Sequence, residues 1–208
     1  MSDKHMKPDL WTERPVDETL DVYADWAESY DADVTERGYV TPARIAEALM
    51  PLLPDDDRPV LDYGCGTGLS GMTLATHGIT PLHGTDISGP MIAKARAKGC
   101  YDTLWTAKAD RLDIAPGAYR AIVAAGVISL GAAPPESMDQ LIDALAPGDL
   151  LALSFNDPTL AHGGYDARLD SHIAAGRLRQ LFREHGAHLT EAGMGADVIV
   201  LGRELDAA

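Results

Sequence analysis

A glycine-rich turn that joins an apolar segment to a helical pattern constrains this chain more than any other feature of its sequence. Residues 60–71 read VLDYGCGTGLSG, with glycines at 64, 66 and 68. Glycine lets the backbone come close to a ligand, and the start of the following helix offers unpaired N–H groups to a negative charge. A tight turn without a ligand would also use glycine. The combination is nevertheless typical of a nucleotide-type cofactor site at the carboxyl end of a strand.

The middle of the chain alternates between strand-like and helix-like segments. Five short apolar segments have the length of strands: 60–63, 82–87, 103–106, 121–128 and 150–155. Helical spacing predicts helices among them at 72–77, 91–97 and 138–146, the last stopped by Pro147-Gly148. Strands that alternate with helices predict an α/β fold with a doubly wound, mostly parallel sheet.

The two ends are expected to differ from this alternation. Two amphipathic helices are predicted before the first strand, at 16–30 and 42–53. At the other end we expect a helix at 177–185 and an antiparallel hairpin of strands at 188–192 and 198–202. The 208 residues suit one domain at 16–208, with N-terminal helices at 16–54, a core at 58–208 and a flexible segment at 1–15 before them.

The identity of the cofactor depends on an acidic residue just before the glycines. Residues 66–71 also fit the dinucleotide pattern GxGxxG, with Asp86 at the distance of a ribose-binding acid. Asp62, however, lies two residues before the first glycine, where a carboxylate would repel a pyrophosphate and could hold a cationic amino-acid head group, directly or through water. This favours S-adenosylmethionine, which carries an ammonium and a sulfonium but no phosphate.

Several motifs, taken in order, resemble those of class I S-adenosylmethionine-dependent methyltransferases. DYGCGTG at 62–68 resembles the first motif of that family, and HGTDIS at 83–88 resembles the second. AAGVISLG at 124–131 and LAPGDLLALSFND at 145–157 follow in the family's order. The opening YADWAESYD at 23–31 and the C-terminal segments are most similar to the methyltransferase-like proteins of the Williams–Beuren deletion region.

The resemblance implies a Rossmann-like, seven-stranded fold, S-adenosylmethionine as cofactor and a role for individual residues. The backbone of Gly64 and Gly66 would face the methionine part, Asp86 would accept hydrogen bonds from the ribose hydroxyls, and Ile87 would flank the adenine. Asp110 would meet the adenine amino group, although an alignment without gaps puts Lys108 at that position. The expected cofactor-binding set is completed by Asp62, Cys65, Met91, Arg111 and Ala125.

Three aromatic residues of the first predicted helix share one face. Tyr23, Trp26 and Tyr30 recur at spacings of three and four residues. They are either ordinary core residues or a lid whose rings cover the cofactor and attract its sulfonium by cation–π contact. The resemblance favours the lid, so these residues join the expected cofactor-binding set.

Composition limits the possible partners and the location of the protein. A net charge of −15 opposes binding to nucleic acids, which favours a small-molecule acceptor. No apolar run approaches the roughly 20 residues needed to cross a membrane, and residues 1–10 do not resemble a secretory signal. Two cysteines cannot form a disulfide framework, so we expect a cytoplasmic protein. The oligomeric state stays open. No metal site is expected, and His185 and His188 are interpreted as a solvent-facing pair.

The expected reaction is in-line displacement at the sulfonium methyl group, helped by alignment of the reactants and exclusion of water. Many relatives carry a histidine after the fourth strand, but here the sequence is Ile128-Ser129-Leu130-Gly131. Asn156, Asp157 and His162 follow the fifth strand and could orient a substrate. No catalytic residue is assigned. A nicotinamide oxidoreductase and a non-catalytic S-adenosylmethionine-binding protein remain as alternatives.

Overall fold

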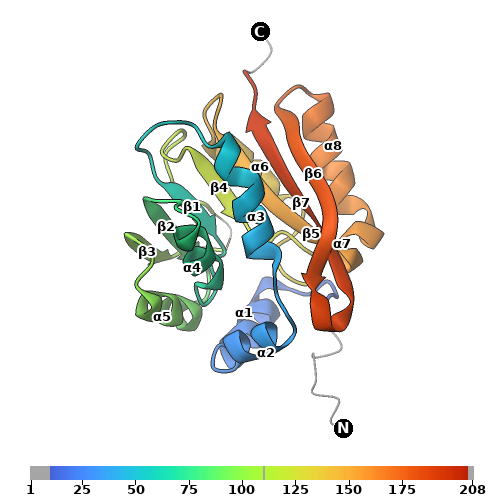
Figure 1. The fold of residues 1–208 in the computed structure, drawn as a ribbon. Helices are drawn as coiled ribbons and strands as arrows, with labels where there is room; N and C mark the ends of the chain where they lie inside the picture. Colours follow the sequence, from blue (N-terminus) through green and yellow to red (C-terminus); the bar gives the residue numbers. More distant parts are fainter. Residues whose placement is uncertain (1–9, 110, 206–208) are drawn as a thin grey trace.

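A seven-stranded sheet forms the centre of the computed structural model, which describes residues 10–109 and 111–205. Its strands run across the middle of Figure 1. Their bounds are β1 Val60–Tyr63, β2 Leu82–Asp86, β3 Thr103–Thr106, β4 Ala121–Ala124, β5 Leu150–Asn156, β6 Leu178–Leu189 and β7 Met194–Arg203.

The strand order is β3-β2-β1-β4-β5-β7-β6. Strands β1 to β5 pair in parallel, whereas β7 is antiparallel to both β5 and β6. The order reverses between β1 and β4, and at such a switch point a crevice opens beyond the carboxyl ends of the strands. The predicted doubly wound sheet with a terminal hairpin is therefore confirmed.

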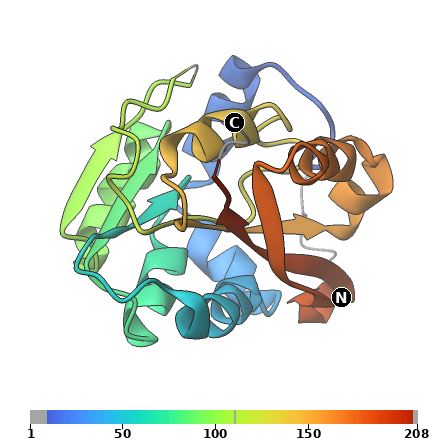
Figure 2. The ribbon, with the colours of Figure 1, turned by 90° about the horizontal axis from the view of Figure 1, so that it is seen from above.

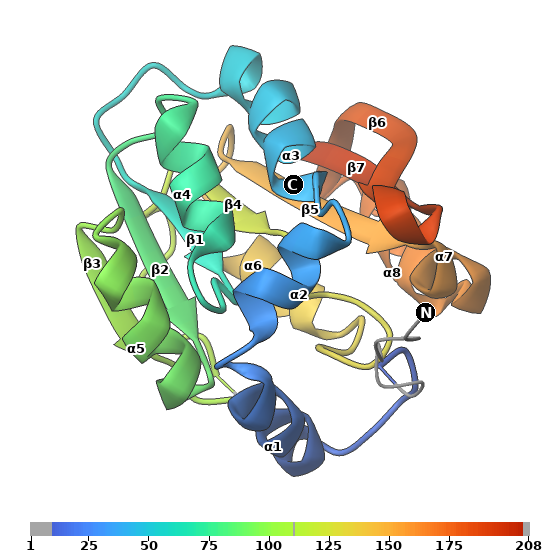
Figure 3. The same cartoon turned by 60° about the horizontal axis from the view of Figure 1, so that its bottom comes forward.

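Helices cover both faces of the sheet and its carboxyl edge (Figures 2 and 3). Helices α3, α4 and α5 lie on one face and α6, α7 and α8 on the other, while α1 and α2 lie across the carboxyl ends of the strands. Their bounds are α1 Val16–Trp26, α2 Tyr30–Glu36, α3 Thr41–Leu49, α4 Leu69–Thr76, α5 Gly89–Lys98, α6 Ser137–Ala144, α7 Asp157–His162 and α8 Gly164–Ala174, with short 3-10 turns at Met50–Leu52 and Thr190–Ala192. None of these described helices has the length and apolar character needed to cross a membrane.

Alternating side chains of the central strands build a separate core on each face. Leu61, Ile122 and Phe155 belong to the core beneath α6 and α8, whereas Val60 and Val123 belong to the core beneath α3 and α4. Every residue of β4 and β5 is buried, as expected for strands covered on both faces. The sheet is thus a rigid base from which the loops at its carboxyl edge project.

The predicted helix at 177–185 is wrong, because this segment forms most of strand β6. Leu178, Leu181 and Phe182 have helical spacing, but a β-bulge produces it. Gln180 pairs with Leu201 and Phe182 pairs with Val200, so Leu181 is an extra residue. The bulge turns Leu181 and Phe182 toward the α3 face, while Leu178 packs on the opposite face.

Other element boundaries also differ from the prediction. The helix expected at 16–30 is interrupted after Trp26 and resumes at Tyr30. The fourth strand ends at Ala124, four residues before the apolar run does, and α7 and α8 were not predicted. The boundary expected at residue 15 stays a prediction, and residues 1–9 lie outside the described part of the chain.

Leucines 49 and 52 provide a test of how α3 holds the sheet. Leu49 is fully buried in the α3-face core, whereas Leu52 is 37% exposed. We expect Leu49→Ala to lower the free energy of unfolding by about 3–5 kcal/mol, because it removes buried methyl groups and leaves a cavity. Leu52→Ala should cost less than about 1 kcal/mol. Urea denaturation measures both, and equal losses would contradict the packing described.

Candidate functional site

A cleft of about 940 Å³, including the open space at its mouth, lies at the carboxyl ends of β1, β2 and β4. The loops after these strands form its floor, and α1 and the start of α2 form its roof. Its walls include Thr19, Leu20, Tyr23, Tyr30, Tyr63, Gly64, Gly66, Asp86, Ile87, Ser88, Met91, Ala107, Ala109, Gly126 and Val127. The glycine turn and the end of β2 thus meet in one cavity, as the sequence predicts.

The glycine turn owes its shape to left-handed backbone at Gly64 and Gly66. Their φ angles are 67° and 52°, in a region that other residues rarely adopt. A Cβ atom at Gly64 would lie 2.5 Å from the side chain of Val127, whereas one at Gly66 would meet nothing within 4 Å. Gly64 is therefore needed for packing against the β4 loop, and the backbone at Gly66 borders open space in the cleft.

Asp86 joins the glycine turn to the end of β2. Its Oδ2 accepts a hydrogen bond from Gly66 N at 2.9 Å, and its Oδ1 accepts one from Ser88 N at 2.8 Å. Burial raises the pKa of this carboxyl, and the two backbone donors oppose that effect. A carboxylate has about four lone-pair positions, so Asp86 can still accept hydrogen bonds from a ligand in the cleft.

Asp62 is fully buried beneath the glycine turn. Its Oδ2 accepts hydrogen bonds from Ser70 Oγ at 2.6 Å and from the Tyr101 hydroxyl at 2.7 Å. Its Oδ1 is buried, and no group among the described residues bonds it. Burial raises the pKa of Asp62 to about 6. A buried carboxylate with one unpaired oxygen is costly, and a bound ligand or water would satisfy that oxygen.

Of the three aromatic residues of the N-terminal helices, two line the cleft and one does not. Tyr23 and Tyr30 line the cleft, and burial raises the pKa of both phenols, so both stay protonated at neutral pH. Trp26 lies beyond them, with its ring centroid 4.7 Å from that of Tyr30 in an edge-to-face contact. The indole N–H of Trp26 donates to Asp33 at 2.7 Å. Trp26 therefore supports the two tyrosines and does not line the cleft.

Ionic contacts hold α1 and α2 against the glycine turn. We call these two helices the lid (residues 16–36). Asp31 at the start of α2 accepts a hydrogen bond from the Thr67 hydroxyl in the glycine turn and pairs with Lys98 of α5 at 2.6 Å. Lys98 also donates to the Thr67 carbonyl at 2.6 Å. A second pair, between Glu28 and Lys94 at 2.8 Å, is much more exposed. Asp31 is thus the principal link between the lid and the glycine turn.

A second cavity of about 610 Å³, its open mouth included, adjoins the cleft. The two share Tyr23, Tyr30 and Gly126 as walls. The remaining walls of the second cavity are mostly aromatic and aliphatic: Leu10, Trp11, Trp26, Val34, Arg37, Tyr39, Ser129, Leu130, Asn156, His188 and Leu189. Asn156, which was expected near a substrate, is also the N-cap of α7, where its Oδ1 accepts from Thr159 N.

His188 is the residue of this second cavity that sequence reasoning missed. Only 8% of it is exposed, which contradicts the solvent-facing pair inferred from its spacing to His185. His185 does have an exposed side chain, at 58%. The sequence does not show which of the two histidines is buried, because the pairing of β6 with a distant strand decides it.

The other expected cofactor-binding residues do not all reach the cleft. Ile87 and Met91 line it. Cys65 packs with Ile92 in a small core cluster, and burial raises the pKa of its thiol. Ala125 packs on the α3-face core, and Arg111 is exposed and paired with Asp113. Asp110 lies outside the described residues, although Ala107 and Ala109 place the neighbouring backbone at the cleft.

Comparison with known proteins agrees with the geometry. Residues 60–148 match the family described as Methyltransferase domain. Methyltransferase-like protein 27 of Homo sapiens is 33% identical over 139 residues, which are 65% of this chain and 56% of that protein. These residues of the chain are thus similar to a methyltransferase domain. The chain spans just over half the length of this relative.

Solved structures share the fold at low sequence identity. A chain from the complex between the Haloferax volcanii Trm112 methyltransferase activator and a methyltransferase gives a TM-score of 0.69 at 17% identity, over 93% of this chain and 100% of that one. The cyclase SpnF gives 0.67 at 15% identity, over 93% and 99%. S-adenosylmethionine-dependent methyltransferases are also among the structures with this fold. At these identities the likeness establishes the fold and leaves the reaction open.

S-adenosylmethionine, the cofactor of this domain family, fits the residues of the cleft. Asp86 offers acceptor positions to ribose hydroxyls, and the Gly66 backbone lies against open space. The unpaired Oδ1 of Asp62 suits an ammonium group reached through the glycine turn or a bridging water. Tyr23, Tyr30 and Gly126 border both this cleft and the second cavity.

The buried carboxyl of Asp62 predicts opposite effects on stability and binding. Its pKa is about 6 in the folded protein against an ordinary value of 3.8. The folded state therefore binds more protons than the unfolded chain between pH 4 and 6, and rising pH destabilises it across that window. Asp62→Asn removes this penalty, so at pH 7 the free variant should be more stable than the wild type by about 1–3 kcal/mol.

The stability difference between wild type and Asp62→Asn should shrink toward zero as the pH falls from 7 to 4. Thermal denaturation of both proteins at several pH values measures it. S-adenosylhomocysteine should nevertheless bind the variant several-fold more weakly, because the ammonium loses a charged partner. A variant that is less stable at pH 7 and binds equally well would show that Asp62 serves only packing.

Proposed function

We propose that this protein transfers a methyl group from S-adenosylmethionine to a small-molecule acceptor that occupies the second cavity. The observation that carries this proposal is the junction of the two cavities, which share Tyr23, Tyr30 and Gly126. A cofactor whose nucleoside lies at Asp86 can direct its methyl group toward that junction. In-line displacement requires donor and acceptor to meet at one point.

The residues of the cleft bind the cofactor and exclude water from it. The bound cofactor supplies an electrophilic methyl group on a positively charged sulfur. Asp86 would hold the ribose hydroxyls, and the backbone of Gly64 and Gly66 would contact the methionine part. The rings of Tyr23 and Tyr30, which line the cleft, would face the positive sulfur with their π-electrons. The closed lid would keep water away from the reacting atoms.

Two features support a small acceptor. The second cavity is an open-mouthed, largely apolar space between the lid, the β4 loop and the C-terminal hairpin, and small-molecule sites are typically concave and mostly apolar. The net charge of −15 opposes a polyanionic substrate. We therefore infer a small molecule, and not a nucleic acid, as the partner in the reaction.

A second function is favoured by one comparison. The cyclase SpnF shares this fold over 93% of the chain. A protein with this fold can therefore be named for a reaction other than methyl transfer. The chain also lacks a histidine in the β4 loop, where it has Ser129 and Gly131. A protein that binds S-adenosylmethionine without transferring its methyl group is the alternative. Incubation with methyl-labelled S-adenosylmethionine and a fractionated metabolite extract distinguishes the two, because only a transferase moves label to a small molecule.

The cofactor site predicts selective binding that depends on Asp86. Calorimetry should detect S-adenosylmethionine and S-adenosylhomocysteine and no NAD. Asp86→Ala should weaken S-adenosylhomocysteine binding at least tenfold, since charge-assisted hydrogen bonds contribute roughly 1.5–3 kcal/mol each. Asp55→Ala is the matched control, because this exposed carboxylate precedes β1 at the opposite edge of the sheet. Binding of NAD alone, or equal affinity in the two folded variants, would contradict the assignment.

The contact between Asp31 and the glycine turn predicts that cofactor binding stabilises the lid. Hydrogen exchange at residues 16–36 should slow when S-adenosylhomocysteine binds. Asp31→Ala should speed exchange there in the free protein and weaken binding about three- to tenfold, because it frees Thr67 and Lys98 together. Glu28→Ala removes only the exposed pair with Lys94 and should change little. Identical exchange in both variants would show that Asp31 does not hold the lid.

A further inference from the structure

The second cavity contains a histidine that the proposed reaction has not yet used. His188 lines it together with Ser129 and Leu130 of the β4 loop and with Tyr30, which also faces the cofactor cleft. The β4 loop itself has no histidine. His188 thus lines the second cavity from β6, a strand at the edge of the sheet.

A β-bulge places His188 in that space. Ala187 pairs with Gly195 and Leu189 pairs with Met194, so His188 is an extra residue between two regular pairs of the hairpin. Bulges turn a side chain away from the alternation of its strand and are frequent next to active sites. Without the bulge, the side chain at 188 would follow the regular alternation of β6.

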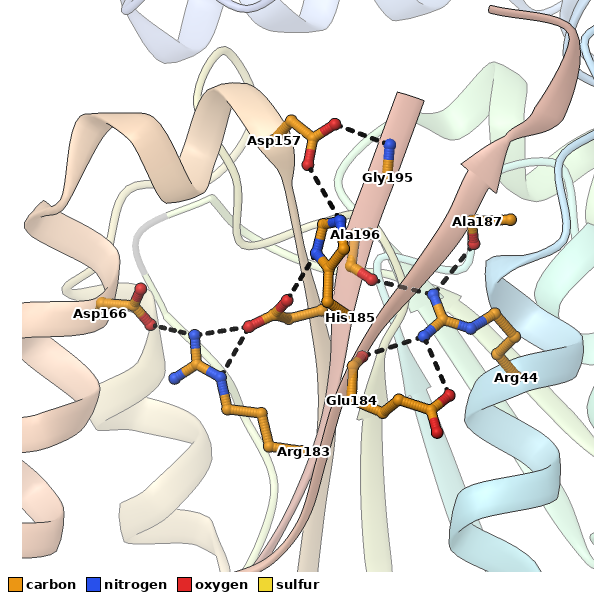
Figure 4. Close-up of polar contacts among 10 residues, drawn as sticks. Arg44, Asp157, Asp166, Arg183, Glu184, His185, Ala187, Gly195 and Ala196 are labelled. Carbon is orange, nitrogen blue, oxygen red and sulfur yellow. Dashed lines mark hydrogen bonds and ion pairs between the residues drawn. The ribbon is translucent and has the colours of Figure 1, made fainter. Parts of the chain in front are cut away.

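Arg44 of α3 supports the backbone on the α3 side of this bulge (Figure 4). Its guanidinium donates to the carbonyls of Ala187 at 3.0 Å, Ala196 at 2.9 Å and Glu184 at 2.9 Å. A Cβ atom at Gly186 would come within 2.7 Å of Arg44 Nη2, so a larger residue there would displace the guanidinium. This partly buried arginine thus satisfies three carbonyls of the irregular hairpin and ties it to α3.

The imidazole of His188 is itself held in one orientation. Its Nδ1 lies 2.7 Å from Thr41 Oγ1, and its ring packs edge-to-face on Tyr39 with centroids 5.3 Å apart. Val40 N donates to the His188 carbonyl at 3.1 Å. Within the described part of the chain no group bonds Nε2, and Nε2 is not among the buried atoms that lack a partner, so it is open to the cavity. In the tautomer that carries its ring hydrogen on Nδ1, Thr41 Oγ1 accepts that hydrogen and the lone pair of Nε2 faces the cavity.

The cavity walls indicate the shape of the molecule that would meet Nε2. Trp11, Trp26 and Tyr39 provide aromatic surface, and Leu130 and Leu189 provide aliphatic surface. Flat rings are held well by such walls through stacking and edge-to-face contacts. An acceptor that is planar and apolar, with one polar atom for His188, matches this arrangement.

We propose that His188 is the general base of the reaction and that the acceptor is a small aromatic molecule with a hydroxyl group, a phenol. This inference rests on the proposed function. The hydroxyl oxygen would form a bond to the methyl carbon while the carbon–sulfur bond breaks and its electron pair stays on sulfur, which gives S-adenosylhomocysteine. The phenolic proton would pass to Nε2 of His188.

His188 carries no charge at neutral pH. Burial lowers its pKa to about 4, while Asp157 on α7 favours the charged form and Arg44 on α3 opposes it. The ring is therefore neutral at pH 7 and has a lone pair for a proton. Thr41 and Tyr39, its other close neighbours, carry no charge at that pH.

His185 is the natural control, since it lies three residues earlier on the same strand. It bonds Asp197 at 2.9 Å and lies 3.7 Å from Asp157, on the α7 side of the hairpin and away from the second cavity (Figure 4). Replacing each histidine with glutamine keeps a polar side chain of similar size. Only the change at His188 should affect an acceptor.

The first experiment measures binding without turnover. Protein saturated with S-adenosylhomocysteine is titrated with 2-naphthol or with 2-methoxynaphthalene, which has no proton to donate, and quenching of tryptophan fluorescence is followed. Wild type and His185→Gln should prefer 2-naphthol about tenfold, the worth of one hydrogen bond. In His188→Gln the preference should fall below about threefold. An equal preference in all three proteins would overturn the assignment of His188.

The second experiment measures transfer. With labelled S-adenosylmethionine and a panel of phenols that includes 2-naphthol and catechol, His188→Gln should lower kcat at least 100-fold, with the affinity for S-adenosylhomocysteine unchanged. His185→Gln should stay within twofold of the wild type. If His188→Gln does not fold, Thr41→Val, which keeps His188 but removes its Nδ1 partner, should lower kcat three- to tenfold.

The outcomes separate this inference from the function on which it rests. A wild-type protein that binds S-adenosylhomocysteine but methylates no phenol would overturn the acceptor class. Equal kcat values for the two histidine variants would overturn the base. A wild-type protein that binds no S-adenosylhomocysteine would overturn the proposed function, and this inference with it.

Discussion

The hydrogen bond between the Asp86 carboxylate and Gly66 N is the contact on which the site depends. It joins the turn after β1 to the end of β2, and Thr67 in the same turn donates to Asp31 of the lid. Two loops and a helix that are distant in sequence therefore share one rigid connection. A cleft assembled in this way exists before any ligand arrives, so binding energy is not spent on ordering the turn.

The C-terminal hairpin of β6 and β7 shapes the second cavity, where the acceptor is proposed to bind. Its two register shifts, at Leu181 and His188, turn side chains out of the regular alternation of β6. The first turns Leu181 toward the core on the α3 face, and the second turns His188 toward the cavity. Arg44 connects that strand to α3, whose buried face packs on the core. The packing of α3 on the sheet therefore also positions His188.

The sequence predicts a feature correctly where neighbouring residues determine it. The turn at 64–68, Asp86 and the alternation of strands and helices are continuous patterns, and the structure has them where they were predicted. Prediction was wrong where a distant contact decides the outcome. Leu178, Leu181 and Phe182 resemble a helix because a bulge creates the same spacing. His188 and His185 look equivalent until the pairing partners of β6 are known, and Trp26 shares a face with Tyr23 yet bonds Asp33 instead of lining the cleft.

This division between local and distant contacts explains why the cofactor is easier to infer than the acceptor. The cofactor cleft uses the turn after β1 and the end of β2, which are short, adjacent and rich in glycine. The second cavity combines residues from 10 to 189, drawn from the lid, the β4 loop, β5 and the hairpin. The cyclase SpnF shares the fold at 15% identity, so the fold does not identify an acceptor, which must be derived from the walls of the second cavity in this protein.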